Sequence, residues 1–285
     1  MQLREYGNTG EMLSIVGFAG IVVKNVDASQ AAADVAWSID HGINYFDVAP
    51  GYGNAQDMLG PALKPYRDDV FLACKTKYRD AKSAREDLEN SLRLLETDHF
   101  DLYQMHAMTT DEDLEQATGP GGALETLVKA RDEGLVRYIG FSVHSSELAV
   151  ELMSRFHFDS VLFPVNWVNY FESGFGPAIM EKAQQEGTAR LALKGLASHL
   201  LSDPSNPVRE KCWYHPIEEQ ELAALALRFT LSQPITAAIP PGDPELFRMA
   251  VEIAEDFTPI TPEETEELKR RASGLSPIFE LAHSH

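Results

Sequence analysis

The chain is poor in cysteine, in basic residues and in long apolar runs. Two cysteines in 285 residues are too few for a disulfide framework or for a four-cysteine zinc or iron–sulfur site. Lys and Arg number 24 against 44 Asp and Glu, and the net charge of −20 disfavours nucleic acid and anionic membranes as partners. No run reaches the roughly 18 apolar residues of a membrane span, and the first residues do not resemble a signal peptide. We therefore predict a cytoplasmic protein.

The apolar residues that are present make up 44% of the chain, which is enough for a sizeable core. They gather in eight short runs, at residues 13–17, 45–49, 70–76, 102–106, 138–143, 160–165, 190–193 and 235–239. Between them, residues 28–41, 81–96, 123–133, 147–155, 178–186 and 218–231 show helical spacing. Eight strands that alternate with helices in about 250 residues predict a closed (β/α)8 TIM barrel. An open doubly wound sheet is the alternative, but no Gly-x-Gly-x-x-Gly turn follows the first run.

The ends of the chain carry additional elements. Residues 1–12 are predicted to form a β-hairpin that turns at residues 8–10 and covers the bottom of the barrel. An accessory C-terminal helix is predicted from Pro262 to Ala272, capped by Thr261. Because no linker divides the chain, residues 1–285 are interpreted as a single barrel domain.

Polar side chains lie where a barrel places its active site, at the carboxyl ends of strands. Asp47 ends the second run, Tyr52 lies in the following loop, Lys75 ends the third run and His106 ends the fourth. A phenol is a poor acid at neutral pH, and an ammonium group beside it lowers its pKa. Such a phenol can protonate a carbonyl oxygen, which the imidazole orients, as hydride reaches the carbon. Hydride requires a nicotinamide cofactor, because no side chain supplies it.

Several segments resemble the aldo-keto reductase family. Residues 42–53 (GINYFDVAPGYG) are similar to the family's signature around its catalytic Asp and Tyr, and residues 101–106 (DLYQMH) resemble the strand that carries its His. Residues 134–142, 163–166 and 237–240 resemble later strands. The resemblance implies a (β/α)8 barrel with NAD(P)(H)-dependent carbonyl reduction or alcohol oxidation. It implies that the catalytic residues, hereafter the catalytic set, are Asp47, Tyr52, Lys75 and His106, with Tyr52 as the proton donor.

The resemblance also implies a cofactor site, in which NADP(H) is favoured over NAD(H) while the preference stays open. Three positions depart from the family: Val143 replaces Asn, Leu162 replaces Gln, and Leu193 replaces a stacking aromatic residue. The usual Lys that grips the 2′-phosphate is also missing, which leaves Arg248 as the candidate. The implied contacts come from Gly20, Ile21, Asp47, Ser142, Asn166, Leu193, Lys194, Gly195, Ile239, Pro240, Gly242 and Arg248.

Two long segments, residues 107–120 and 197–216, are expected to overhang the pocket. The second carries His199, Trp213, Tyr214 and His215, whose aromatic rings offer a stacking surface for a sugar or a ring. Cys74 is interpreted as a small buried apolar residue, and Cys212 as a free thiol in a polar loop.

Two other functions stay open from the residues alone. A metal-dependent isomerase or hydrolase would use Asp47, His106 and His144 as ligands, but it would leave Lys75 and Tyr52 idle. A non-catalytic or regulatory protein would share the fold without turnover. The intact catalytic set favours an enzyme without a metal site that interconverts a small carbonyl compound (an aldehyde, ketone or sugar) and an alcohol. The sequence specifies no oligomeric state.

Overall fold

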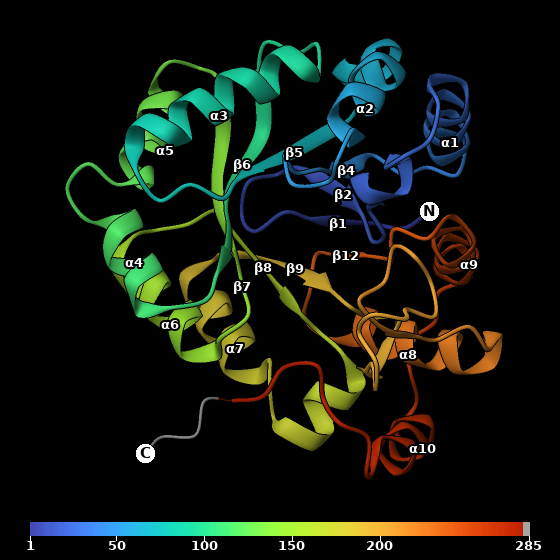
Figure 1. Cartoon of the computed structure of the whole chain (residues 1–285). Coiled ribbons are helices and arrows are strands. Elements are labelled where there is room, and N and C mark those ends of the chain that lie inside the picture. Colours follow the sequence, from blue (N-terminus) through green and yellow to red (C-terminus); the bar gives the residue numbers. More distant parts are fainter. Residues whose placement is uncertain (282–285) are drawn as a thin grey trace.

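The computed structural model describes residues 1–281 and forms an eight-stranded barrel surrounded by helices (Figure 1). Its strands are β3 (Phe18–Ala19), β4 (Tyr45–Asp47), β5 (Phe71–Thr76), β6 (Phe100–Met108), β7 (Val136–Val143), β8 (Ser160–Pro164), β9 (Ala189–Leu193) and β12 (Ala237–Ile239). Neighbouring strands pair in parallel, and a parallel bridge between Val16 and Ala238 brings the two edges of the sheet together. The predicted (β/α)8 barrel is confirmed.

Helices follow the strands and cover the outside of the barrel. They are α1 (Ala28–Asp40), α2 (Ala55–Leu63), α3 (Ala81–Leu94), α4 (Asp111–Thr118), α5 (Ala123–Asp132), α6 (Ser146–Arg155), α7 (Pro177–Glu186), α8 (Gln220–Ser232), α9 (Pro244–Glu255) and α10 (Pro262–Ala272), with short turns η1 (Gly20–Val23), η2 (Lys64–Asp69) and η3 (Asn169–Ser173). In α3, Ala84 and Leu88 are buried, and Asp80 caps the helix by accepting the backbone N–H of Ser83 at 2.8 Å. The predicted helices agree with these bounds to within about two residues.

The accessory helix α10 begins and ends where the sequence predicts. The Thr261 hydroxyl accepts the backbone N–H of Glu264 at 3.2 Å, and the Glu264 carboxylate accepts the backbone N–H of Thr261 at 2.9 Å. This reciprocal capping box satisfies two backbone donors at the start of the helix. None of the helices described in residues 1–281 combines the length and apolar character needed to cross a membrane.

The N-terminal hairpin consists of β1 (Leu3–Glu5) and β2 (Met12–Ser14), which pair antiparallel. It is two residues longer than predicted, because the run at 13–17 is divided between this hairpin and the approach to β3. Arg4 donates to backbone carbonyls that precede β12, which places the hairpin at the amino-terminal end of the barrel as predicted.

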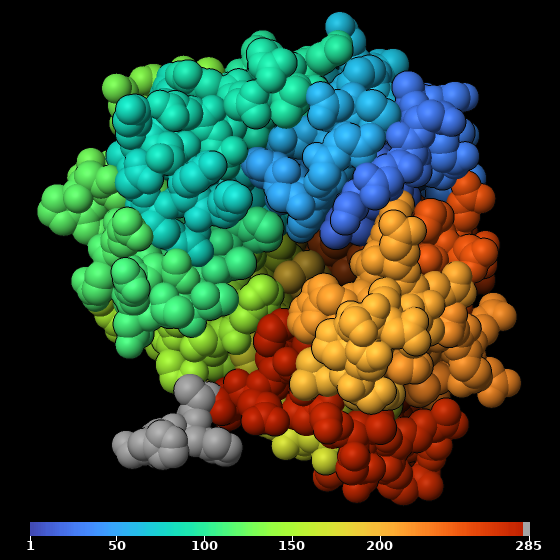
Figure 2. Space-filling model, viewed as in Figure 1, coloured from blue at the N-terminus to red at the C-terminus, as the bar shows by residue number. Residues whose placement is uncertain are grey.

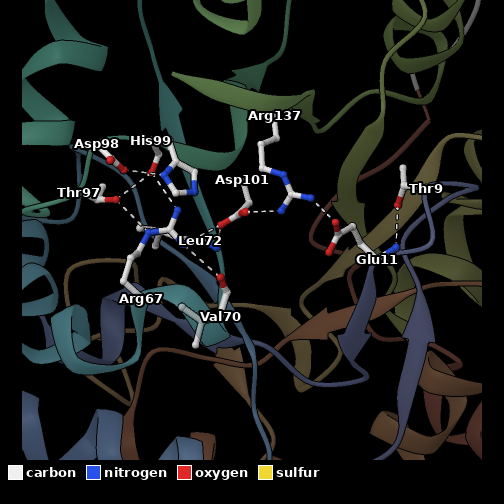
Figure 3. A network of polar contacts seen from close by, with 10 residues as sticks. All are labelled: Thr9, Glu11, Arg67, Val70, Leu72, Thr97, Asp98, His99, Asp101 and Arg137. Carbon is white, nitrogen blue, oxygen red and sulfur yellow. Dashed lines mark hydrogen bonds and ion pairs between the residues drawn. The ribbon is translucent and has the colours of Figure 1, made fainter. Parts of the chain in front are cut away.

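Ion pairs also tie this amino-terminal end together (Figure 3). Asp101, near the start of β6, pairs with Arg67 at 3.0 Å and with Arg137 at 2.8 Å, and it accepts the backbone N–H of Leu72 at 2.8 Å. Arg137 pairs in addition with Glu11, in the turn of the hairpin between β1 and β2. These ion pairs connect the strands at the amino-terminal end, whereas barrel proteins bind their ligands at the carboxyl ends of the strands.

The carboxyl end is hollowed at its centre (Figure 2). One side of the hollow is covered by residues 197–216, hereafter the cover segment, which contains an unpredicted hairpin of β10 (Ala197–Leu200) and β11 (Tyr214–Pro216). Another side is bordered by residues 273–281, hereafter the C-terminal tail, drawn in red. Residues 107–120, which were expected to overhang the site, instead contribute α4, which packs on α5 and α6.

Candidate active site

A buried ion pair between Asp47 and Lys75 lies at the carboxyl ends of β4 and β5. Each side chain is only 2% exposed, and Lys75 Nζ donates to Asp47 Oδ1. The other carboxylate oxygen, Oδ2, accepts from Tyr45 Oη at 3.2 Å and from Gln104 Nε2 at 3.1 Å. Buried charges are stable only when they are paired and hydrogen-bonded, and Asp47 meets both conditions.

Tyr45 and Gln104 were not among the residues selected from the sequence. Each lies two positions before a selected residue, Tyr45 before Asp47 and Gln104 before His106. Because side chains two apart in a strand point to the same face, Tyr45 and Gln104 share the face of the site residues. The two-residue spacing along each strand could therefore have identified Tyr45 and Gln104 from the sequence.

Tyr52 lies in the loop between β4 and α2, with its ring edge-on to that of His106 at a centroid distance of 6.1 Å and an angle of 87°. Burial and the Asp47 carboxylate hold the pKa of the Tyr52 phenol well above its ordinary value. The expectation of a lowered phenol pKa is therefore wrong for this structure. The Lys75 ammonium is paired with Asp47, so its charge is compensated and burial dominates at the phenol.

His106 is held by its backbone as well as by its strand. Arg79 donates to the backbone carbonyls of His106 and Ala107, both at 3.0 Å. Ala107 has φ +53°, a strained conformation for this residue, and its N–H donates to Ser142 Oγ at 2.7 Å. Burial, and to a lesser degree the positive charge of Lys75, lower the pKa of His106 to about 3. The imidazole is therefore neutral at physiological pH.

This low pKa predicts that acidification destabilises the protein. Between pH 6.5 and pH 3, this histidine is protonated in the unfolded state, where its pKa is about 6.5, but stays neutral in the folded state. The free energy of unfolding therefore decreases as the pH decreases through that window. From pH 7 to pH 5 we expect a loss of about 2 kcal/mol from His106 alone. Urea unfolding of the wild type and of His106→Gln at both pH values measures it. An equal pH dependence in the two proteins would contradict the assignment.

A pocket opens beside these residues, between the carboxyl ends of β3, β4, β9 and β12 and the cover segment. Tyr52 of the catalytic set lines it, as do the predicted cofactor contacts Ile21, Asp47, Leu193, Lys194, Ile239, Pro240 and Gly242. The sequence did not single out Lys211 as a contact, but it also lines the pocket. Trp213 and Tyr214 line it too, so the expectation that the cover segment overhangs the site is confirmed.

Two lysines of this pocket fit an anionic ligand. Lys194 has φ +67°, and its Nζ lies over the rings of Tyr214 and Trp213, at 4.6 and 5.0 Å from the centroids. Burial lowers the pKa of Lys194 to about 8. Lys211 Nζ donates to the Val22 backbone carbonyl at 2.8 Å. Among the side chains of residues 1–281, no carboxylate lies within 4.0 Å of either ammonium group.

Five residues that the family resemblance assigns to the cofactor do not line this pocket: Gly20, Ser142, Asn166, Gly195 and Arg248. Asn166 positions the turn after β9, because its amide donates to the carbonyls of Lys194 and Ala197. Arg248 pairs with Asp34 of α1 at 3.1 Å and lies over Trp37. Sequence reasoning had no signal for the partners of Arg248, which are more than 200 positions away in the chain.

Neither cysteine is placed for chemistry. Cys74 and Cys212 are both free and buried. The prediction of a free thiol in a loop is confirmed for Cys212, but this thiol is buried within the cover segment beside Tyr214. Burial raises the pKa of Cys74 to about 12. Within residues 1–281, no three His, Cys, Asp or Glu side chains are grouped closely enough to hold a metal ion.

Eight parallel strands with polar side chains gathered at their carboxyl ends define the class of (β/α)8-barrel proteins. A sequence profile of the Aldo/keto reductase family matches residues 15–269, and the chain belongs to this family. It is 24% identical to the "Uncharacterized oxidoreductase YqkF" of Bacillus subtilis, over 94% of this chain and 96% of that protein. It is 32% identical to the L-galactose dehydrogenase of Arabidopsis thaliana, over 50% of this chain and 48% of that protein.

Solved structures show the same fold. The holo form of the aldo-keto reductase AKR11C1 from Bacillus halodurans matches with a TM-score of 0.76 and 22% identity, over 98% of both chains. The thermostable aldo-keto reductase Tm1743, solved with the inhibitor epalrestat, matches with a TM-score of 0.72 and 25% identity, over 95% of this chain and 99% of that one.

Proposed function

We propose that this protein is a cytoplasmic NAD(P)(H)-dependent oxidoreductase that converts a small carbonyl compound to an alcohol. One observation carries the proposal. Tyr52 and His106 lie edge-on to each other beside the buried Asp47–Lys75 pair, next to a pocket with apolar walls and two lysines, Lys194 and Lys211. Within residues 1–281, neither of these lysines forms an ion pair with a carboxylate. A nicotinamide dinucleotide needs both features, since its ring is flat and its diphosphate is anionic.

The substrate carbonyl oxygen would lie between Tyr52 and His106. The neutral His106 donates a hydrogen bond that orients the oxygen, and Tyr52 Oη delivers the proton. The bound reduced nicotinamide supplies hydride to the carbonyl carbon. Tyr52 is protonated at physiological pH, as an ordinary phenol is, so its hydroxyl is available to donate to the substrate oxygen. The Asp47–Lys75 pair beneath the phenol adds no net charge.

The cofactor would extend from Tyr52 towards the cover segment. Leu193 and Ile239 offer an apolar surface to the nicotinamide, and Lys194 and Lys211 would pair with the diphosphate. Gly242 lets the loop after β12 pass directly over η1, since a Cβ atom there would overlap Ile21 Cγ2 at 1.3 Å. The proposed contact of Arg248 with a 2′-phosphate requires the phosphate to compete with Asp34.

Separate titrations with NADPH and NADH test the proposal. We expect saturable binding of at least one cofactor, followed by oxidation of that cofactor when small aldehydes are added. Calorimetry measures the affinities, and absorbance at the nicotinamide band measures turnover. Binding without turnover of any aldehyde would support a non-catalytic protein, and no binding of either cofactor would refute the proposal.

The Arg248→Ala variant tests the cofactor preference. If Arg248 contacts the 2′-phosphate, its removal weakens NADPH binding about tenfold, the cost of one charged hydrogen bond at a partly exposed site. NADH binding is expected to stay within about twofold. Arg270→Ala, on the exposed face of α10, is the matched control. Equal losses for both cofactors would remove Arg248 from this role.

A further inference from the structure

His144 is a second imidazole at the barrel mouth, and the proposed mechanism does not use it. It directly follows β7, and its backbone N–H lies 3.4 Å from the carbonyl of Met108 in β6, the strand that carries His106. Its ring stacks on Phe279 of the C-terminal tail, with centroids 4.7 Å apart and an angle of 3° between the planes. His144 is thus held beside the catalytic set by contacts to its ring face and backbone.

The tail that carries Phe279 is tied to the mouth of the barrel. The Phe279 backbone carbonyl accepts from Ser173 Oγ at 2.9 Å, and the preceding N–H of Ile278 donates to Asn169 Oδ1 at 2.9 Å. The Phe279 ring also lies 5.8 Å from that of Trp213, which lines the cofactor pocket. His144, Phe279 and Trp213 therefore form a continuous row of aromatic rings that ends at the pocket lined by Trp213.

Within residues 1–281, neither ring nitrogen of His144 forms a hydrogen bond, so both can bind a ligand. Burial, followed by the positive charge of Lys194, lowers the pKa of His144 to about 4, and no hydrogen bond from the described residues contributes. The ring is then neutral at physiological pH and presents one N–H donor and one nitrogen acceptor. A phenyl ring would stack on Phe279 equally well without the cost of a partly buried polar edge. The stack alone therefore does not account for an imidazole at this position.

We propose that His144 determines specificity by binding a hydroxyl group on the carbon next to the substrate carbonyl. A hydroxyl both donates and accepts, and so does a neutral imidazole. His106 orients the carbonyl oxygen while His144, at the end of the neighbouring strand, holds the adjacent hydroxyl. Trp213, which is half exposed and next to Phe279, would add an aromatic surface for the carbon chain. The preferred substrates are hydroxylated aldehydes, and this inference rests on the proposed function.

The test compares 2-hydroxypropanal with propanal, which differ only in that hydroxyl, using the full chain saturated with its cofactor. We expect the wild type to favour 2-hydroxypropanal about tenfold in kcat/KM, the amount that one neutral hydrogen bond supplies. His144→Phe keeps the stack on Phe279 and should remove this preference through KM, leaving propanal turnover and cofactor affinity within about twofold. His144→Gln, which retains hydrogen-bonding groups, should keep part of the preference.

His157→Phe is the matched control, since His157 is exposed and precedes β8 at the opposite end of the barrel. If His144→Phe does not fold, His144→Leu gives the same comparison. If the His144 variants keep the preference, or lose the same factor in kcat/KM for both aldehydes, the inference about His144 is refuted while the proposed function stands. Wild-type protein that reduces neither aldehyde overturns the proposed function and this inference together.

Discussion

Tyr52→Phe is expected to lower kcat for carbonyl reduction by about 10²–10⁴-fold, the usual contribution of a positioned general acid. The variant loses only the hydroxyl, so the ring can keep its edge-on contact with His106 at 6.1 Å. The Asp47–Lys75 pair beneath it is held by Tyr45 and Gln104, not by Tyr52, and should persist. Cofactor affinity should therefore change by less than about twofold, because the removed hydroxyl acts on the substrate in the transition state and does not hold the cofactor.

Stopped-flow or steady-state rates with a reducible aldehyde measure kcat, and calorimetry measures the cofactor affinity. Tyr66→Phe is a suitable control, since Tyr66 lies in η2 directly before β5 and thus at the amino-terminal end of the barrel, away from the site. Wild-type rates in Tyr52→Phe would show that another group donates the proton. A joint loss of rate and cofactor affinity would instead indicate that the phenol organises the pocket.

Lys75→Met is expected to lower the free energy of unfolding by about 3–5 kcal/mol, because it leaves the Asp47 carboxylate buried without a countercharge. Both side chains are 2% exposed, so water cannot replace the ammonium group. The hydrogen bonds from Tyr45 and Gln104 remain and offset part of the loss. Turnover should fall as well, since the unpaired carboxylate lies beside Tyr52 and makes ionisation of the phenol still less favourable.

Urea unfolding measures this loss, and the double variant Asp47→Asn/Lys75→Met completes the cycle. We expect the double variant to be more stable than Lys75→Met, because the buried charge is then absent. Lys64→Met is the surface control: Lys64 pairs with Glu96 at 2.9 Å but is 67% exposed, so its loss should be under about 1 kcal/mol. Equal effects of Lys75→Met and Lys64→Met would refute the importance of burial.

The barrel could be predicted from the sequence because most of its strands and helices are encoded locally. Apolar runs of strand length and helices with caps such as Thr261 alternate through the chain, and each run buries itself against its neighbours. One exception is the run at 13–17, where the end of β2 and the bridging residue Val16 have different partners within one apolar segment. Pairing partners are a property of the assembled sheet, so no local pattern separates them.

The positions of the proposed catalytic residues could also be predicted, since parallel strands bring their carboxyl ends together and the four selected residues lie near those ends or in the loop that follows. The charge environment of these residues could not be predicted. Sequence reasoning placed an ammonium group beside a phenol, but the direction in which Lys75 points decides whether its charge acts on Tyr52 or is compensated by Asp47.

The order of residues in this chain determined the barrel, the hairpin below it and the candidate catalytic set, because those features depend on local periodicity and on the common direction of the strands. Tertiary structure alone decided which charges are paired. Arg248 meets Asp34 across more than 200 positions, and Phe279 from the far end of the chain covers His144. Electrostatics and burial depend on distances through space, and those distances exist only once the chain has folded.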